Sequence, residues 1–176
     1  MIDLKNHIMM VPDYPKHGIR YRDITPLLAH PPAFRQAIEQ LAGLVQQTGA
    51  EAVFGVESRG FLFAAPVATQ LGLPLILVRK HGKLPRATHK ASYELEYGMD
   101  HMEVHCDDVQ PGQRCVVIDD VLATGGTAGA VIKLLELAGA RVAGAVFLIE
   151  LLGLAGAVNL APHSVYSLLQ YDINDS

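Results

Sequence analysis

The chain has 176 residues, of which 50% are hydrophobic and 18% charged, and its formal net charge is −4. This composition predicts one globular domain over residues 1–176, and the net negative charge argues against nucleic acid or an anionic membrane as a general partner. The first residues contain no apolar signal core, and Cys106 and Cys115 lack the spacing of zinc ligands. We therefore expect a soluble, cytoplasmic protein with reduced thiols.

Strands and helices are expected to alternate after a first segment, residues 1–33, that is punctuated by Pro and Gly. Residues 31–49 have helical spacing, with prolines at the start and Gly49 just past the end. Helices are also expected at 60–72 and 126–138, and strands at 52–56, 75–78, 114–118, 141–150 and 164–171. Because these strands are continuous apolar runs, they indicate an α/β fold with a parallel twisted sheet of about five strands and helices on both faces.

Residues 80–109 break this alternation, because no helical period appears there. Two strands, 89–98 and 101–106, are predicted with a turn at 97–100, and five basic residues lie between Arg79 and Lys90. A basic insertion that ends in a hairpin is typical of a movable flap over an active site. We interpret His101 and His105 as surface histidines rather than as a metal site.

Polar residues follow three of the predicted strands, at 57–59, 79–80 and 119–120, and the ends of parallel strands meet in one crevice. After Asp119 and Asp120 comes a Thr-Gly-Gly-Thr turn at a helix start, where Gly125 and Gly126 can turn backbone N–H groups toward a phosphate. The two carboxylates would accept hydrogen bonds from ribose hydroxyls or hold a hydrated Mg²⁺. This pattern predicts a ribose 5-phosphate ligand. The alternative is an ordinary strand-to-helix turn with a capping Thr.

The stretch "VVIDDVLATGGT" resembles the phosphoribosyl pyrophosphate signature of the type I phosphoribosyltransferases. The stretches "GIRYRDITPLL", "ESRGFLF", "VRKHGKLPR", "YELEYG" and "SLLQYD" narrow the resemblance to the adenine phosphoribosyltransferases, a branch of that family. The resemblance implies the family's fold, with a hood at residues 1–33 and a flap at 80–109. It also implies an enzyme that converts adenine and phosphoribosyl pyrophosphate into AMP and pyrophosphate, with Mg²⁺ carried on the substrate, and a homodimer.

The resemblance further assigns roles to single positions. Main-chain groups near Arg20 would pair with the adenine edge, Tyr21 and Arg22 would complete the base site, and the catalytic residues would be Glu96 in the flap and Arg59. Spacing alone does not separate Glu96 from Glu94. The 5-phosphate would bind Ala123, Thr124, Gly125, Gly126 and Thr127, the ribose Asp119 and Asp120, and the pyrophosphate Glu57, Ser58, Arg59, Arg79, Lys80 and Lys83. In this family the Glu57–Ser58 peptide is often cis and binds pyrophosphate through main-chain N–H groups, and one cationic contact can come from the partner subunit.

Two other functions remain open at the level of sequence. A phosphoribosyltransferase for hypoxanthine, guanine or xanthine would share the loop at 119–127 but not both "GIRYRDITP" and "YELEYG". A protein that senses phosphoribosyl pyrophosphate without turning it over would need a nucleic-acid surface or a damaged flap. No protein-only metal site is expected, because Mg²⁺ would reach Asp119 and Asp120 through water.

Overall fold

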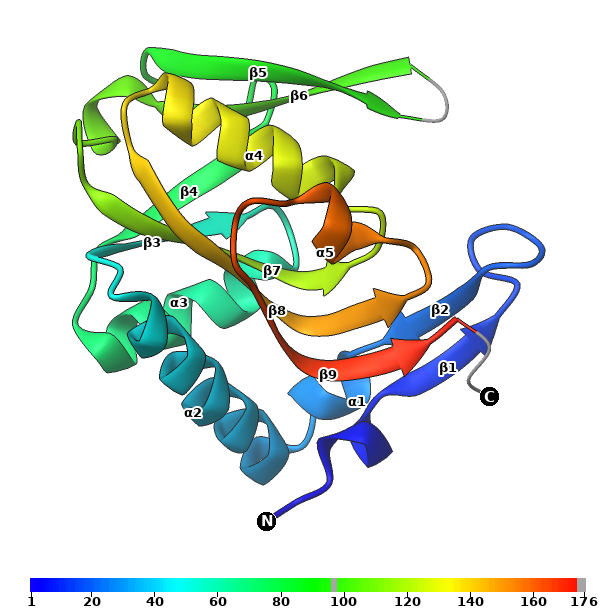
Figure 1. Cartoon of the computed structure of the whole chain (residues 1–176). Helices are drawn as coiled ribbons and strands as arrows, with labels where there is room; N and C mark the ends of the chain where they lie inside the picture. Colours follow the sequence, from blue (N-terminus) through cyan, green and yellow to red (C-terminus); the bar gives the residue numbers. More distant parts are fainter. Residues whose placement is uncertain (96–97, 174–176) are drawn as a thin grey trace.

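The computed structural model describes residues 1–95 and 98–173, with the backbone alone for 92–95 and 98–100. Its described strands form a twisted sheet of seven, in the order β5-β6-β4-β3-β7-β8-β9 (Figure 1). Five of them are parallel, as predicted: β3 (Ala52–Val56), β4 (Leu75–Lys80), β7 (Arg114–Leu122), β8 (Arg141–Leu152) and β9 (Val165–Asp172). The sheet exceeds the expected size because the hairpin extends it.

Helices cover both faces of the parallel strands (Figure 1). On one face α2 (Pro31–Thr48) and α3 (Gly60–Leu71) enclose one apolar core, and α4 (Gly126–Leu137) encloses a second core on the other. The predicted ends of α2 are confirmed. Two prolines stand at its start, and Gly49 caps its end with a φ of 64°. Fully buried side chains such as Leu41 each contribute about 1.5–3 kcal/mol.

The register of the central strands brings the polar strand ends together. Val56 of β3 pairs with Val78 of β4, and Gly55 pairs with Ile118 of β7. The residues that follow each pair therefore lie at the same edge of the sheet. The apolar run after residue 141 is a strand followed by the short helix α5 (Gly156–Asn159), and no described helix is long and apolar enough to cross a membrane.

The hairpin of β5 (Thr88–Leu95) and β6 (Gly98–His105) joins the sheet through β4, where Arg79 pairs with Glu103 and Lys80 with Met102. The predicted turn at 97–100 was wrong, because Gly98 pairs with Leu95 and the strand continues through residues 99 and 100. A 3₁₀ turn, Cys106–Asp108, follows β6. His105 is buried rather than on the surface, since strand alternation turns it toward the protein beside Glu103.

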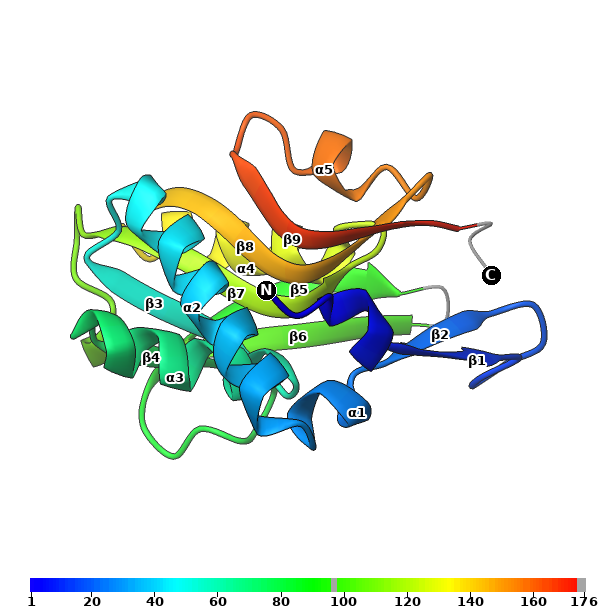
Figure 2. The same cartoon turned by 90° about the horizontal axis from the view of Figure 1, so that it is seen from below.

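The hood is a second, two-stranded sheet at the N-terminus. It consists of β1 (Met9–Pro12) and β2 (Arg20–Asp23), which pair antiparallel, with the 3₁₀ turn η1 (Leu4–His7) and the short helix α1 (Thr25–Leu28) on either side. Both views place this ribbon beside the carboxyl ends of β8 and β9 (Figures 1 and 2). The hood thus lies at the edge of the sheet where the polar strand ends converge.

Candidate active site

A small hollow of about 100 Å³ lies at the start of α4 and is lined by Asp119 and by residues 121–128. Gly125 precedes the helix with a φ of 85°, which an L side chain rarely adopts. A Cβ at this glycine would also lie 3.0 Å from the carbonyl oxygen of Gly156 in α5. Asn159 of α5 donates a side-chain hydrogen bond to the Thr124 carbonyl oxygen, at 2.9 Å. The predicted turn is therefore held from outside by α5, a contact that sequence reasoning missed.

Asp119 and Asp120 lie side by side near the end of β7. Burial, with the charge of Asp120 adding to it, raises the pKa of Asp119 well above its usual value. Burial also raises the pKa of Asp120. The positive charge of Arg59, whose Nε lies 2.7 Å from Asp120 Oδ2, partly offsets this rise. Gly60 permits this close packing, because a Cβ there would lie 2.9 Å from Asp119 Oδ1. Asp120 is thus buried and Asp119 partly buried, with Arg59 as the cation beside them.

Arg59 also connects the carboxylates to the hood. Its Nη1 donates a hydrogen bond to the Tyr21 hydroxyl, and its guanidinium lies 5.2 Å from the centre of the Tyr21 ring. Tyr14 packs edge-on against Tyr21, with ring centroids 5.1 Å apart. Arg20 and Arg22 point the other way, into a separate cavity of about 470 Å³, because strand alternation places them opposite Tyr21. Arg20 and Arg22 therefore do not line the cavity that Tyr21 lines.

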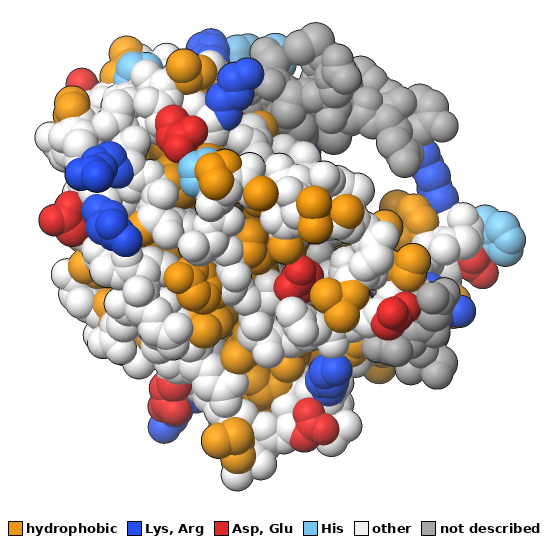
Figure 3. Space-filling model, viewed as in Figure 1, with side chains coloured by type: hydrophobic (Ala, Val, Ile, Leu, Met, Phe, Trp, Pro, Cys, Tyr) orange, Lys and Arg blue, Asp and Glu red, His pale blue; other side chains and the backbone are white. Residues whose placement is uncertain are grey.

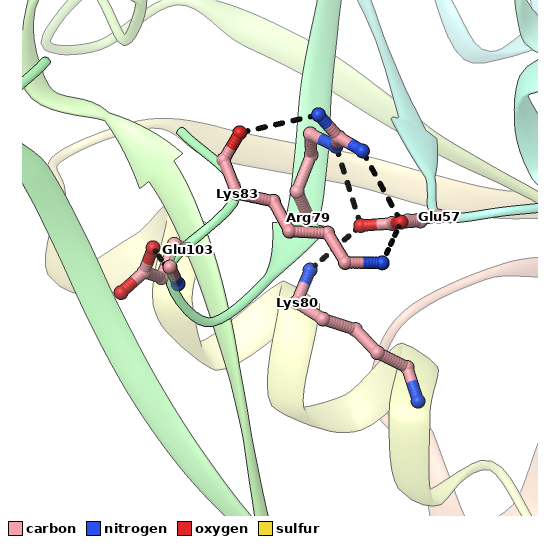
Figure 4. Close-up of polar contacts among 6 residues, drawn as sticks. Glu57, Arg79, Lys80, Lys83 and Glu103 are labelled. Carbon is pink, nitrogen blue, oxygen red and sulfur yellow. Dashed lines mark hydrogen bonds and ion pairs between the residues drawn. The ribbon is translucent and has the colours of Figure 1, made fainter. Parts of the chain in front are cut away.

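The segment after β3 begins with Glu57 and Ser58, which are joined by a cis peptide bond, as the resemblance implies. The Glu57 side chain binds two of the basic residues, a contact that the sequence did not indicate. It is 7% exposed and accepts hydrogen bonds from Arg79 and Lys83, as Figure 4 shows. Burial alone would raise the pKa of Glu57, but these bonds and the Lys80 N–H lower it to about 2.

These strand ends surround one cavity of about 520 Å³. Its walls combine hood, strand-end and hairpin residues: Tyr14, Pro15, Tyr21, Glu57, Ser58, Arg59, Lys80, Met102, Asp119, Asp120 and Thr127. Asp119 and Thr127 also line the smaller hollow, so the two spaces adjoin. Arg79 and Lys83 do not line the cavity, and Glu96 lies outside the described residues. Tyr14, Pro15 and Met102 had no signal in the sequence.

Comparisons with known proteins show the family of the chain. A model of the phosphoribosyl transferase domain matches residues 23–163. The adenine phosphoribosyltransferase of Roseiflexus castenholzii is 52% identical over 170 residues, which cover 97% of this chain and 99% of that protein.

Two solved structures are similar over nearly their whole length. The adenine phosphoribosyltransferase of Rhodothermus marinus has a TM-score of 0.89 at 48% identity, covering 96% of each chain. That of Saccharomyces cerevisiae, complexed with adenine and D-2,5-dideoxy-2,5-imino-altritol 1,6-bisphosphate, has a TM-score of 0.88 at 35% identity, covering 94% of this chain and 96% of that one. This chain belongs to the phosphoribosyl transferase domain family and, within it, to the adenine phosphoribosyltransferases.

Proposed function

We propose that this chain transfers ribose 5-phosphate from phosphoribosyl pyrophosphate to adenine, giving AMP and pyrophosphate in purine salvage. The observation that carries the proposal is the cavity of about 520 Å³, which is lined by the hood, the carboxylates and Lys80 at the end of β4 and adjoins the glycine hollow. In this arrangement the glycine hollow would bind the phosphate, the carboxylates the ribose, Lys80 the leaving group and the hood the base. The family to which the chain belongs supports the same reaction.

The sugar phosphate would lie across the end of β7. In this arrangement the backbone N–H groups of residues 123–127 surround the 5-phosphate at the start of α4, where the helix dipole also favours an anion. The ribose hydroxyls then donate to Asp119 and Asp120, whose carboxylates have few cationic partners of their own. Donors meet the phosphate while acceptors meet the sugar.

Mg²⁺ would enter with the substrate. Among the described residues no group of three or more His, Cys, Asp or Glu could hold a metal ion. Asp119 and Asp120 offer two adjacent carboxylates, a donor set that suits a hydrated cation resting on them through water. When bound, the ion supplies positive charge that offsets the charge of the pyrophosphate leaving group.

The pyrophosphate would lie between Lys80 and the turn formed by Glu57 and Ser58, all of which line the cavity. The side-chain nitrogens of Arg79 and Lys83 donate hydrogen bonds to the Glu57 carboxylate. These two cations therefore attract the leaving group mainly through their charge. As the bond to the anomeric carbon breaks, its electron pair leaves with pyrophosphate. The ribosyl cation that develops is then attacked by the glycosidic nitrogen of the base.

Adenine would pack on the Tyr21 ring at the edge of β2. An extended strand presents the N–H and C=O of one residue at the same edge, and such a pair matches a ring nitrogen and the exocyclic amine of adenine. The oxopurines have the opposite polarity at these atoms, so buried groups would lose their partners. Arg59 would reach the base or the leaving group from its place between Tyr21 and Asp120.

Glu96 remains our candidate for the group that accepts a hydrogen bond from the imidazole side of adenine as the proton leaves. The hairpin that carries it would close over the cavity and exclude water. Replacing Glu96 with Gln separates two roles, because Gln keeps part of the hydrogen-bonding ability. A loss of kcat of about 10²-fold or more supports proton abstraction, and a loss of a few-fold contradicts it.

A homodimer is also part of the proposal. On the face in Figure 3, hydrophobic side chains are interspersed with basic, acidic and other polar groups. On α3 and β4, by contrast, the large side chains of Leu62, Leu75 and Leu77 are 42%, 36% and 37% exposed, and a second copy of the chain would cover them. Light scattering with Leu77→Lys tests this surface, since the variant should become monomeric. A cytoplasmic location is expected as well and can be tested by fractionation.

The deciding experiment is nucleotide formation from phosphoribosyl pyrophosphate and Mg²⁺ with adenine, hypoxanthine and guanine in separate reactions. AMP as the only product supports the proposal, including main-chain recognition beside Arg20. Product from the oxopurines would instead assign the chain to another base. Tight binding of phosphoribosyl pyrophosphate without any product would indicate a sensor.

A further inference from the structure

The segment 79–83, which we call the basic turn, is held from two sides by buried carboxylates. On one side Glu57 at the end of β3 accepts from the Lys80 N–H at 3.0 Å and from Lys83 Nζ at 2.5 Å. On the other side Glu103 of β6 accepts from the Gly82 N–H at 3.1 Å. Figure 4 shows the two glutamates on opposite sides of the turn. Consecutive parts of one loop are thus anchored to two different strands.

Glu57 gathers the side chains of the turn around itself. Arg79 approaches with two nitrogens, Nε at 3.3 Å from Oε2 and Nη2 at 3.3 Å from Oε1, and its Nη1 donates to the Lys83 carbonyl oxygen at 3.2 Å. The turn therefore closes into a ring of contacts that begins and ends on one carboxylate. Without that anion, two cations held this close would repel each other and the turn would open.

Glu103 makes the same kind of contact from the hairpin. Its side chain is 2% exposed and meets His81 Nδ1 and, at 3.0 Å, Lys90 Nζ of β5. Burial alone would raise its pKa, but the hydrogen bonds from Lys90, His81 and Gly82 N–H lower it. Both glutamates are ionised at neutral pH, so the turn stays anchored between the sheet and the hairpin.

Lys80 lies at the centre of this arrangement but its side chain goes elsewhere. Only its backbone N–H contacts Glu57, and in Figure 4 its side chain extends away from that carboxylate. Lys80 lines the cavity of about 520 Å³, whereas Arg79 and Lys83 do not. The two glutamates hold the groups on either side of Lys80, and the Lys80 side chain lines the cavity.

We infer that Glu57 and Glu103 are positioning residues that clamp the basic turn so that Lys80 enters the cavity to meet the pyrophosphate group. This inference rests on the proposed function for the identity of the ligand. The glutamates act through Lys80 and do not contact the ligand by their carboxylates. Each should therefore matter for binding of phosphoribosyl pyrophosphate and of pyrophosphate, and little for binding of adenine.

A double-mutant cycle tests this chain of action. We expect Glu57→Gln and Glu103→Gln each to raise the KM for phosphoribosyl pyrophosphate about 10-fold while leaving the KM for adenine within about 2-fold. In a Lys80→Met background, Glu57→Gln should change the KM for phosphoribosyl pyrophosphate less than about 2-fold. If Glu57→Gln still raised the KM for phosphoribosyl pyrophosphate about 10-fold in the Lys80→Met background, the inference would be overturned. A wild-type KM in the single variants would overturn it as well.

Glu51 supplies a matched control. It stands at the other end of β3 and accepts from the backbone N–H of Arg114 at 3.0 Å, far along the strand from the cavity. Glu51→Gln therefore neutralises a similar strand-end carboxylate and should leave both KM values unchanged. A rise of the KM for phosphoribosyl pyrophosphate in this variant would mean that the loss of any strand-end charge perturbs the site, which contradicts a specific clamp.

Two further measurements keep the test decisive. If the glutamine variants unfold, Glu57→Asp and Glu103→Asp keep the charge but shorten the reach of each carboxylate, and each should raise the KM about 3-fold, again only when Lys80 is present. Calorimetry with Mg²⁺ and pyrophosphate alone reports the clamp without catalysis. If the wild-type protein binds pyrophosphate but forms no AMP, the proposed function fails while the clamp is still tested; equal pyrophosphate binding by wild type and Glu57→Gln overturns the clamp.

Discussion

The ends of β7 and β3 both carry buried carboxylates, yet the protein surrounds them differently. Asp119 and Asp120 share one cationic partner among the described side chains, Arg59, and the pKa of each aspartate is raised. Glu57 is saturated by donors, and its pKa falls to about 2. Burial raises the pKa in both places; the donors around Glu57 outweigh this effect, whereas Arg59 does not outweigh it at the aspartates. The aspartates, with few hydrogen-bond donors around them, can accept hydrogen bonds from a ligand. The Glu57 carboxylate instead holds the protein groups that donate to it.

The largest effect is expected when a charge is removed from the aspartate pair, Asp119 and Asp120. We expect Asp120→Asn to lower kcat/KM for phosphoribosyl pyrophosphate about 10²-fold, because a hydrogen bond to a charged group is worth about 1.5–3 kcal/mol. Steady-state assays at saturating adenine measure this. A loss of less than 3-fold would show that the ribose does not depend on Asp120.

The packing that pushes the pair together can be altered next. A Cβ at Gly60 would lie 2.8 Å from the Ile118 carbonyl oxygen and 2.9 Å from Asp119 Oδ1, so Gly60→Ala should destabilise the protein by about 2 kcal/mol. Gly43 lies within α2 with no atom within 4 Å of its Cβ position, and Gly43→Ala should stabilise by about 0.5–1 kcal/mol. Urea unfolding compares the two. Equal effects would remove the special role of Gly60.

The opposite pKa shifts predict opposite dependences of stability on pH. Because the pKa of Glu57 is lowered from 4.5 to about 2, its stabilisation is present above pH 4.5 and is lost as the pH falls toward 2. Because the pKa of Asp119 is raised from 3.8, stability instead falls as the pH rises through its folded-state pKa.

Urea unfolding at several pH values separates the two groups. Glu57→Gln should remove about 1–2 kcal/mol of stability near neutral pH and flatten the acid limb below pH 4.5. Asp119→Asn should increase stability at neutral pH while it impairs activity. If the two variants had the same pH dependence as the wild type, neither carboxylate would carry the predicted shift.

The smallest expected effect concerns Arg59, the cation beside the aspartate pair. Tyr21 accepts a hydrogen bond from Arg59, so Tyr21→Phe should loosen Arg59 and raise the KM for adenine about 5-fold, the equivalent of one hydrogen bond. Tyr14→Phe removes a hydroxyl from the same cavity and should change the KM less than 2-fold. An equal change in both variants would indicate a general effect of hood packing.

Local patterns were enough to predict the parallel sheet and the glycine turn that precedes α4. Continuous apolar strands, the Gly49 helix end and the Thr-Gly-Gly-Thr turn each act within a few residues, so one sequence reveals them. The register of parallel strands then brings residues 57, 79–80 and 119–120 to one edge without further information.

Contacts between distant segments were not predictable in this way. Glu57 meets Lys83 across 26 positions, and Asn159 reaches Thr124 across 35, because loop packing rather than periodicity decides these pairs. The hairpin turn was misplaced since Gly98 and Asp100 have turn propensity, yet pairing with β5 keeps them in β6. Glu96 remains a prediction from resemblance alone.

The two-residue junction between β4 and β6 has a consequence for how such a protein can change over evolution. Residues 75–78 of β4 pair with β3, and residues 79–80 pair with β6, so the two ladders meet end to end on one strand. Insertions or deletions toward the tip of the hairpin would therefore leave the register of the five parallel strands intact. The hairpin can therefore diversify as a separate module while the parallel sheet stays the same.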